Sequence, residues 1–557
     1  MRFYSVSSYW VVLLLVLVVK AGPIEARVAI ASAHPLATQA GFEMIEQGGN
    51  VFDAAVAVSA ALAVVEPAGS GLGGGGFWLL HDAEKNNSIM LDGREKAPLA
   101  ARTDMFLDEQ GNFNPQASKN GALAAGIPGL AAALVHLSER YGRLSLEVCL
   151  QPAIRYARQG FEIGPRHQKL LRFRLRALQK NPTAARVLLD HGKIPAVGYV
   201  LHQPELARTL ELLAQKGRAG FYQGEVAAKL LASVKRGGGI WTQQDLDQYQ
   251  VVERAPIQGE YRGIKITSAA LPSSGGIVLT ESLNILSAFP LAQFDAVTRI
   301  HVVAEAMRRA YHDRALYLGD SDFVDAPVAR LLNPDYAAGR RQNIRLDRAL
   351  PSAYLSETGF EADAGKHTTH FSIIDDKGNR VAATLSVNFP FGAAFMAEGT
   401  GVLLNDEMDD FVARPGTQNG YGLIGGAANA IAPGKRMLSS MTPTFLQDES
   451  RVAVLGTPGG SRIISMVLLA TLDFAAGYGP DSWVNVPRFH HQYIPDQIQY
   501  EKGGLTDDEI VGLKALGHRL KEKGYRYGNM QAVQWNLKTG RLTAASDPRG
   551  EGLARVR

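Results

Sequence analysis

Two hydroxyl side chains, those of Thr368 and Ser386, occur where a predicted hairpin can bring them together. The segment 365–388, GKHTTHFSIIDDKGNRVAATLSVN, predicts two strands joined by a turn over residues 376–379. With the turn centred there, Thr368 at the start of the first strand faces Ser386 near the end of the second. Because side chains alternate along a strand, Ser386 and Asn388 project to the same side. A hydroxyl becomes an effective nucleophile once a neighbouring base removes its proton, so this pair is a candidate for nucleophilic chemistry.

The same pattern has an ordinary structural interpretation. Threonine is common in strands whatever their function, and the segment can be part of a sheet with no reactive group. Taken alone, the hairpin therefore leaves both interpretations open.

A glycine-rich segment over residues 69–80, GSGLGGGGFWLL, contains a GxGxxG match at Gly71, Gly73 and Gly76. A dinucleotide-binding loop needs a strand before these glycines and a helix after them. Here a helical pattern precedes the glycines and a strand pattern follows them. We therefore expect close backbone packing beneath a site rather than a nucleotide.

Other common chemistries have little support in the sequence. The chain has thirteen histidines but neither an HExxH motif nor a GxSxG motif, and the pair His490 and His491 lies in a stretch that reads as a loop. The single cysteine, Cys149, cannot form an internal disulfide, and its apolar context predicts a buried, inert thiol. We expect no metal and no organic cofactor.

Six further motifs favour the functional interpretation of the hairpin over the structural one. They are TTHFS, LNDEMDDF, KRMLSSMTP, GTPGGSR, LDGREKAP and AASDPR. Together they make the chain, from about residue 28 to 549, similar to the gamma-glutamyltransferase family of N-terminal-nucleophile hydrolases. The resemblance implies an α+β fold of four layers, an αββα sandwich in which two antiparallel sheets are covered by helices. It also implies a precursor that cleaves itself between His367 and Thr368.

The resemblance assigns catalytic roles to four residues. Thr368 is the expected nucleophile, and a chain-terminal threonine carries its own base in the α-amine that cleavage frees. Ser386 matches the position, often threonine in the family, whose hydroxyl holds the nucleophile's oxygen. The backbone N–H groups of Gly459 and Gly460 match the donors that stabilise the oxyanion. Pro-Gly-Gly is also good turn chemistry, so a plain turn stays an alternative for these glycines.

Substrate-binding roles follow from the same motifs. Arg94, Ser439 and Ser440 match the group that holds the α-carboxylate of a γ-glutamyl donor, which a guanidinium can bind with two hydrogen bonds. This group lies in the motifs LDGREKAP and KRMLSSMTP.

Acceptors for the donor's α-ammonium are expected at Asn388, Glu407 and Asp410. On pattern alone, the two acids could belong to a solvated acidic loop. In the family a loop over residues 413–426 closes over the donor, which makes Tyr421 a gate. A surface loop without this role is the alternative.

Helices and strands are expected to be unevenly distributed along the chain. A helical pattern over residues 36–46 ends at a glycine pair, and a second helix, apolar on all sides, begins near Asp53. Helical patterns dominate residues 130–350, whereas short alternating runs typical of strands follow residue 365. This distribution favours an α+β architecture.

The N-terminal segment indicates where the protein acts, and the overall charge indicates which partners it does not bind. Residues 1–26 have the basic start, apolar run and small residues of a signal peptide, and the run is shorter than a membrane span needs. Cleavage after about Ala26 is therefore favoured, and an uncleaved anchor is the alternative. We expect a large subunit of residues 27–367 and a small subunit of residues 368–557, interleaved in one fold in the periplasm or outside the cell, with no stable membrane insertion. A net charge of +4 without a basic block argues against nucleic acid as a partner.

The expected reaction is transfer of the γ-glutamyl group of glutathione or a related amide to water, an amino acid or a peptide. An acylase of the same fold, such as a cephalosporin acylase, is the nearest alternative, but it would not need Arg94, Glu407 and Asp410. A relative that stays uncleaved and only binds γ-glutamyl ligands is a second alternative.

Overall fold

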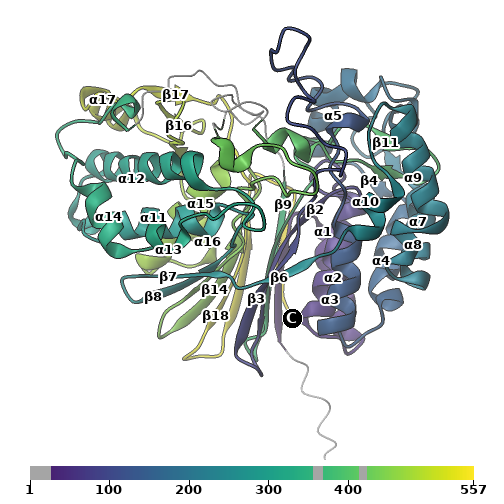
Figure 1. Cartoon of the computed structure of the whole chain (residues 1–557). Coiled ribbons are helices and arrows are strands. Elements are labelled where there is room, and N and C mark those ends of the chain that lie inside the picture. The colour runs from purple at the N-terminus through teal and green to yellow at the C-terminus, as the bar shows by residue number, and fades with distance from the viewer. Residues whose placement is uncertain (1–26, 356–367, 413–422, 424) are drawn as a thin grey trace, which may run out of the picture.

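The structure, a computed structural model, describes residues 27–355, 368–412, 423 and 425–557. Two antiparallel sheets lie face to face between two layers of helices (Figure 1). The predicted four-layer αββα sandwich is confirmed. His367 and Tyr421 lie outside the described residues.

The first sheet has seven strands and mixes parts of the chain that are far apart in sequence. Their order across the sheet is β20 (Leu553–Val556), β1 (Val28–Ser32), β9 (Thr369–Asp375), β10 (Arg380–Ser386), β2 (Gly75–Asp82), β3 (Asn87–Gly93) and β6 (Val252–Arg254). Side chains alternate between its faces, so Phe371 and Ile373 pack on the helices while Ile374 faces the second sheet.

The second sheet has six strands. Their order is β19 (Leu542–Ser546), β18 (Gln531–Asn536), β14 (Arg451–Gly456), β13 (Thr444–Gln447), β8 (Ile264–Ser268) and β7 (Ile257–Tyr261). In both sheets, strands that precede residue 368 are hydrogen-bonded to strands that follow it, as in the pairs β1 with β9 and β8 with β13.

Helices cover the outer face of each sheet (Figure 1). Beside the first sheet lie α1 (Pro35–Glu46), α2 (Val51–Val65), α3 (Leu130–Tyr141), α4 (Leu146–Gln159), α5 (Pro165–Leu178), α6 (Pro182–Leu188), α7 (Pro204–Lys216), α8 (Ala219–Tyr222), α9 (Gly224–Arg236) and α10 (Gln243–Gln248). Beside the second lie α11 (Gly275–Leu286), α12 (Ala296–Tyr317), α13 (Val328–Leu331), α14 (Pro334–Arg341), α15 (Arg462–Ala475), α16 (Pro480–Asn485) and α17 (Asp507–Ala515). Short strands complete the fold: β4 (Phe161–Glu162), β5 (Val200–Leu201), β11 (Met396–Ala397), β12 (Val402–Leu403), β15 (Phe489–His490), β16 (Ile498–Tyr500) and β17 (Leu520–Glu522).

Helix α2 is the buried helix that the sequence predicts, since all of its residues are buried. It begins at Val51, two residues before the expected start near Asp53. Asn50 caps it by accepting the N–H groups of Phe52 and Asp53, and the Asp53 carboxylate accepts the Asn50 N–H in return.

The glycine-rich segment before β2 packs closely against backbone, as expected. A Cβ atom on Gly73 would collide with the carbonyl oxygen of Leu403, and one on Gly74 with that of Ser386. The segment connects a helix to a strand, which is the reverse of the order that a dinucleotide-binding loop needs. These glycines allow the end of β10 to lie against the start of β2.

Two further expectations concern the histidine pair and the cysteine. The interpretation of His490 and His491 as loop residues is wrong for His490, which belongs to β15, and both side chains are fully buried. His490 Nδ1 forms a hydrogen bond with the Ser465 hydroxyl, and His491 Nε2 forms one with the Asp496 carboxylate. Cys149 is buried and free, and burial raises the pKa of its thiol.

None of the helices in the described part of the chain is both long and apolar enough to cross a membrane.

The close packing of Gly74 generates a testable expectation. In Gly74→Ala, the added methyl group meets the Ser386 carbonyl oxygen and the Val387 side chain, so the end of β10 must shift. Overpacking of this kind destabilises a protein by about 1–3 kcal/mol, which thermal or denaturant unfolding can measure. Gly339→Ala in α14 is the matched control, because nothing lies within 4 Å of the added atom and stability should stay the same or rise slightly. Equal effects of the two substitutions would contradict the packing argument.

Candidate active site

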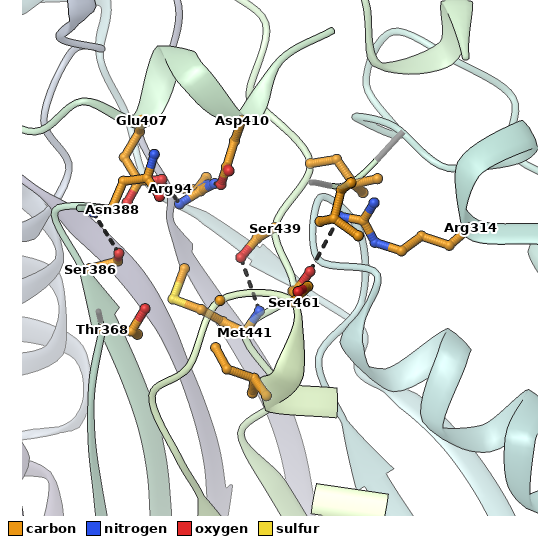
Figure 2. A pocket seen from close by; sticks show the side chains of 15 residues that line it. Arg94, Arg314, Thr368, Ser386, Asn388, Glu407, Asp410, Ser439, Met441 and Ser461 are labelled. Atoms are coloured by element: carbon orange, nitrogen blue, oxygen red, sulfur yellow. Dashed lines mark hydrogen bonds and ion pairs between the residues drawn. The ribbon is translucent and has the colours of Figure 1, made fainter. Parts of the chain in front are cut away.

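One pocket collects residues from segments that are far apart in the sequence (Figure 2). It encloses about 310 Å³ of empty space, part of which is open to solvent. Nine of the residues that the sequence predicts for a site line this pocket: Arg94, Thr368, Ser386, Asn388, Glu407, Asp410, Ser439, Ser440 and Gly460. Gly459 directly precedes the lining residue Gly460 in the sequence but does not itself line the pocket.

The predicted hairpin places Thr368 opposite Ser386. Strands β9 and β10 pair with Thr369 opposite Leu385, and this register continues to Thr368 and Ser386 at the mouth of the pair. Only 3% of the surface of each of these two side chains is exposed. By this register the two residues lie opposite each other, and both line the pocket.

Asn388 lines the pocket because of a left-handed backbone turn after β10, not because strand alternation continues past Ser386. Strand β10 ends at Ser386, and Asn388 has a φ of 72°, in the left-handed region. Its backbone N–H donates to Ser386 Oγ at 2.8 Å, and its Nδ2 donates to the carbonyl oxygen of Asp406 at 3.0 Å. These bonds hold the turn and fix the Ser386 hydroxyl beside Thr368.

Arg94 forms ion pairs with two acids, whereas the sequence motifs had placed it in one binding group with Ser439 and Ser440. Its Nη1 lies 2.5 Å from Glu407 Oε2, and its Nη2 lies 2.6 Å from Asp410 Oδ2. The two acids come from a short 3-10 helix over Glu407–Asp410, and the Arg94 side chain is 1% exposed. In the described residues, Ser439 Oγ instead accepts the N–H of Met441 at 3.1 Å.

The carboxyl groups around Arg94 titrate unusually. Burial raises the pKa of Asp410 to about 7, with Glu407 adding to the rise and Arg94 opposing it. Burial and the neighbouring Glu407 also raise the pKa of Glu95 well above its ordinary value. Glu407 Oε1 is buried and has no hydrogen-bond partner among the described residues. The pocket therefore offers a buried acceptor oxygen of Glu407 beside a carboxyl, that of Asp410, whose pKa is raised toward neutrality.

Gly459 and Gly460 lie in the turn between β14 and α15. Their φ angles are 150° and 59°, which L-residues with side chains rarely adopt. The turn directly precedes α15, whose N-terminal end carries a partial positive charge. This is a suitable place for backbone N–H groups to stabilise an anion, although the alternative of a plain turn has the same geometry.

Two residues at or beside the site were not predicted from the sequence. Arg314, on α12, lines the pocket and donates to the hydroxyls of Ser274 and Ser440. Glu66 directly follows α2 and accepts a hydrogen bond from the Thr369 hydroxyl at 2.5 Å. Burial raises the pKa of Glu66 to about 7, although Arg166 and this hydrogen bond oppose the rise. The sequence carries no signal for either residue, because each acts through contacts with a distant segment.

Comparison with known proteins agrees with this geometry. The sequence model of the family described as gamma-glutamyltranspeptidase matches residues 37–556. The chain belongs to the gamma-glutamyltranspeptidase family. A protein of Pseudomonas sp. strain A14 named glutathione hydrolase proenzyme is 45% identical over 496 residues, covering 88% of this chain and 86% of its own. A protein of the same name from Escherichia coli K12 is 40% identical, covering 93% and 90%.

Solved structures show the same fold. A cephalosporin acylase from Bacillus halodurans superposes with a TM-score of 0.83 at 26% identity, covering 95% of this chain and 96% of its own. A gamma-glutamyltranspeptidase chain from Helicobacter pylori is 42% identical with a TM-score of 0.57, covering 58% of this chain and 93% of its own. The fold is thus common to proteins whose names give different substrates.

The raised pKa of Glu66 predicts how stability depends on pH. Its pKa lies above the ordinary 4.5, so the stabilising contribution of the protonated form is complete below pH 4.5 and is lost as pH rises through about 7. Glu66→Gln should remove this dependence, so that the difference in unfolding free energy between the two proteins changes by roughly 3 kcal/mol from pH 4.5 to 8. Denaturant unfolding at several pH values measures it. Glu84→Gln, at an exposed position, should follow the unsubstituted protein, and a parallel curve for Glu66→Gln would refute the assignment.

Proposed function

We propose that this chain is a gamma-glutamyltransferase with glutathione hydrolase activity, and that it cleaves itself before Thr368. The observation that carries the proposal is the pocket itself, where Thr368 lines one small cavity with the buried Arg94 and Glu407 and the partly exposed Asp410. A γ-glutamyl donor has an α-carboxylate and an α-ammonium beside the amide that reacts, so it needs groups of both charges near one nucleophile. The names of the relatives that are 40–45% identical support the same activity.

Catalysis starts from the N-terminus that cleavage creates. The freed α-amine of Thr368, with an ordinary pKa of about 7.7–8.0, takes the proton of its own hydroxyl. The hydroxyl oxygen attacks the γ-carbonyl carbon, and the N–H groups of Gly459 and Gly460 stabilise the oxyanion. Collapse breaks the amide bond, and the leaving amine receives the proton. Water, an amino acid or a peptide then attacks the glutamyl ester and restores Thr368.

Donor recognition uses the two kinds of charge in the pocket. The free Oε1 of Glu407, together with Asp410 and Asn388, accepts the α-ammonium. The hydroxyls of Ser439 and Ser440 hold the α-carboxylate. Arg94 holds the two acids in place through its ion pairs and contributes its charge to the same end of the pocket.

The precursor is organised as the sequence suggests. Residues 1–26 are a signal peptide, residues 27–367 the large subunit and residues 368–557 the small subunit, and the mature enzyme is exported to the periplasm or the cell exterior. Tyr421, which lies outside the described residues, keeps the gating role that the family resemblance implies. The mixed order of strands in both sheets supports the view that the subunits form one fold.

The nearest alternative is an acylase for another acyl group. The structural likeness to a cephalosporin acylase shows a shared fold, but that chain is only 26% identical, compared with 40–45% for the proteins named glutathione hydrolase proenzyme. The acids around Arg94 also favour a donor with an ammonium group.

Self-cleavage can be tested through the nucleophile. Thr368→Ala lacks the hydroxyl that attacks the preceding carbonyl, so it should remain a single chain without activity, whereas Thr368→Ser keeps a hydroxyl and should still be processed. Gel electrophoresis and N-terminal sequencing give the result, and the smaller piece of the unsubstituted protein should begin Thr368-Thr369-His370. Processing of Thr368→Ala at the normal rate would exclude this mechanism.

Substrate class is tested with the purified, processed protein. A chromogenic γ-glutamyl anilide should be hydrolysed, and a dipeptide acceptor should increase release of the chromophore if transfer to peptides occurs. Arg94→Lys keeps the charge but loses the paired hydrogen bonds to both acids, so kcat/KM should fall by about 10- to 100-fold while self-cleavage continues. Cleavage of a cephalosporin side-chain amide in preference to the γ-glutamyl anilide would favour the acylase instead.

A further inference from the structure

A second cavity lies near the start of β9. It encloses about 360 Å³ of empty space, part of which is open to solvent. Its lining includes Ala33 and His34, which directly follow β1, and Glu66, which directly follows α2. The mechanism proposed above gives these residues no role. Glu66 connects the cavity to β9, because its Oε2 accepts a hydrogen bond from the Thr369 hydroxyl at 2.5 Å.

The residues around the nucleophile extend past the end of β1. Strand β9 pairs with β1 as far as Phe371, which lies opposite Ser32, the last residue of β1. On its other side, β9 pairs with β10 as far as Thr369, opposite Leu385. Thr368 and Thr369 therefore lie where the first sheet continues on the β10 side alone. A strand end with fewer ladder hydrogen bonds is held less firmly than the middle of the strand.

Glu66 contacts this end of β9 from a rigid support. Its N–H donates to the Leu62 carbonyl oxygen in the last turn of the fully buried helix α2, at 2.9 Å. Its own carbonyl oxygen accepts the N–H of Gly69 at 2.8 Å. A Cβ atom on Gly69 would lie 3.3 Å from Glu66 Cδ and 3.4 Å from the carbonyl oxygen of Thr368. The Glu66 carboxyl group is thus separated from the backbone of Thr368 by little more than this glycine.

The ionisation of Glu66 depends on the groups that share its cavity. The other ionisable residues of the lining are His34, Glu162, Arg166, His167 and Glu551. Burial raises the pKa of Glu66 to about 7, while Arg166, whose Nε lies 4.0 Å from Glu66 Oε1, opposes the rise and Glu551 adds to it. Burial lowers the pKa of both histidines to about 4, so they are neutral where Glu66 titrates.

A charge at Glu66 is more than the Thr369 hydroxyl needs for a structural hydrogen bond. A glutamine would present an acceptor oxygen of similar reach without the unfavourable burial of a carboxylate. A hydrogen bond to an ionised acceptor is roughly twice as strong as one between neutral groups. The contact between Glu66 and Thr369 therefore strengthens as the pH rises through about 7.

We propose that Glu66 is a positioning residue of the nucleophile, which holds the start of β9 through the Thr369 hydroxyl and so keeps the Thr368 hydroxyl in place for attack. It acts through Thr369 and not by contact with the donor. The same hydroxyl attacks the preceding carbonyl in the precursor and the donor in the mature enzyme, so both steps depend on this contact. The inference rests on the proposed function, since that function makes Thr368 the nucleophile.

The first test removes either partner of the contact. Glu66→Gln removes the charge, and Thr369→Val replaces the hydroxyl with a methyl group of similar shape. In each variant, kcat of the processed enzyme for a γ-glutamyl anilide at pH 8.5 should fall by about 5- to 20-fold, because a displaced nucleophile attacks more slowly. KM should change by less than about twofold, since other residues line the donor pocket. Thr369→Ser keeps the hydroxyl and should retain most of kcat.

Two further variants show whether Glu66 acts through Thr369. In the double variant Glu66→Gln/Thr369→Val, kcat should be no lower than in the more damaged single variant, because either substitution removes the same contact. Glu162→Gln is the matched control, since it neutralises an exposed acid of the same cavity. Its kcat should stay within about twofold of the unsubstituted value.

The pH dependence separates positioning from a general loss of stability. The ratio of kcat between the unsubstituted enzyme and Glu66→Gln should be about 10 at pH 8.5, where Glu66 is ionised, and about 2 at pH 5.5, where it is protonated. Thr369→Ser should keep the pH profile of the unsubstituted enzyme. A ratio that is equal at both pH values, or losses that multiply in the double variant, would overturn the role of Glu66.

Self-cleavage gives a second measurement in the same proteins. Gel electrophoresis should show slower appearance of the small subunit in Glu66→Gln and Thr369→Val but not in Thr369→Ser. If Glu66→Gln fails to fold, the two Thr369 variants decide, and equal rates of cleavage and turnover in both would overturn the inference. An unsubstituted protein that cleaves itself but does not turn over the γ-glutamyl anilide would refute the proposed donor class, while the cleavage rates still test Glu66.

Discussion

The pairing of β9 inside the first sheet is the constraint on which the site depends. Strand β9 is hydrogen-bonded to β1 on one side and to β10 on the other, so it cannot slip without moving both neighbours. Thr368 is the residue directly before this strand. Its position, and that of Ser386 opposite, therefore follow from strand register rather than from the conformation of a loop. The glycines before β2 complete the arrangement by letting β10 end close to them.

The same pairing explains how a cut before Thr368 could leave the fold intact. Strands β1, β2 and β8 precede residue 368, and their partners β9, β10 and β13 follow it. Cleavage would remove one covalent bond but no strand pairing and no part of the packed core. The new terminus would stay at the end of β9, because the sheet on both sides holds that strand. A freed amine would thus be held beside its own hydroxyl without a separate binding element.

The sequence was informative where structure is local or strongly patterned. The hairpin from Thr369 to Ser386 follows from alternation and a turn, and the buried helix α2 follows from its unbroken apolar composition. Local patterns of this kind could not predict which distant segments of the chain contact each other. The ion pairs of Arg94 with Glu407 and Asp410 join residues more than 300 positions apart, and Arg314 donates a hydrogen bond to Ser440 across 126 positions. The left-handed backbone at Asn388 was also missed, since strand alternation was assumed to continue past Ser386.

Charge, rather than fold, distinguishes the chemistry that this pocket can perform. The cephalosporin acylase shares almost the whole fold at 26% identity, so strand register and the glycine turn are not enough to select an acyl group. In this chain, Arg94 is held between two acids, whereas the hydrogen bonds of Arg314 to described residues go to the hydroxyls of Ser274 and Ser440. The pocket is thus lined by groups of both charges. Electrostatic attraction is stronger in a low-dielectric cavity than in water. A ligand that carries both a positive and a negative charge is therefore bound more tightly through each of them.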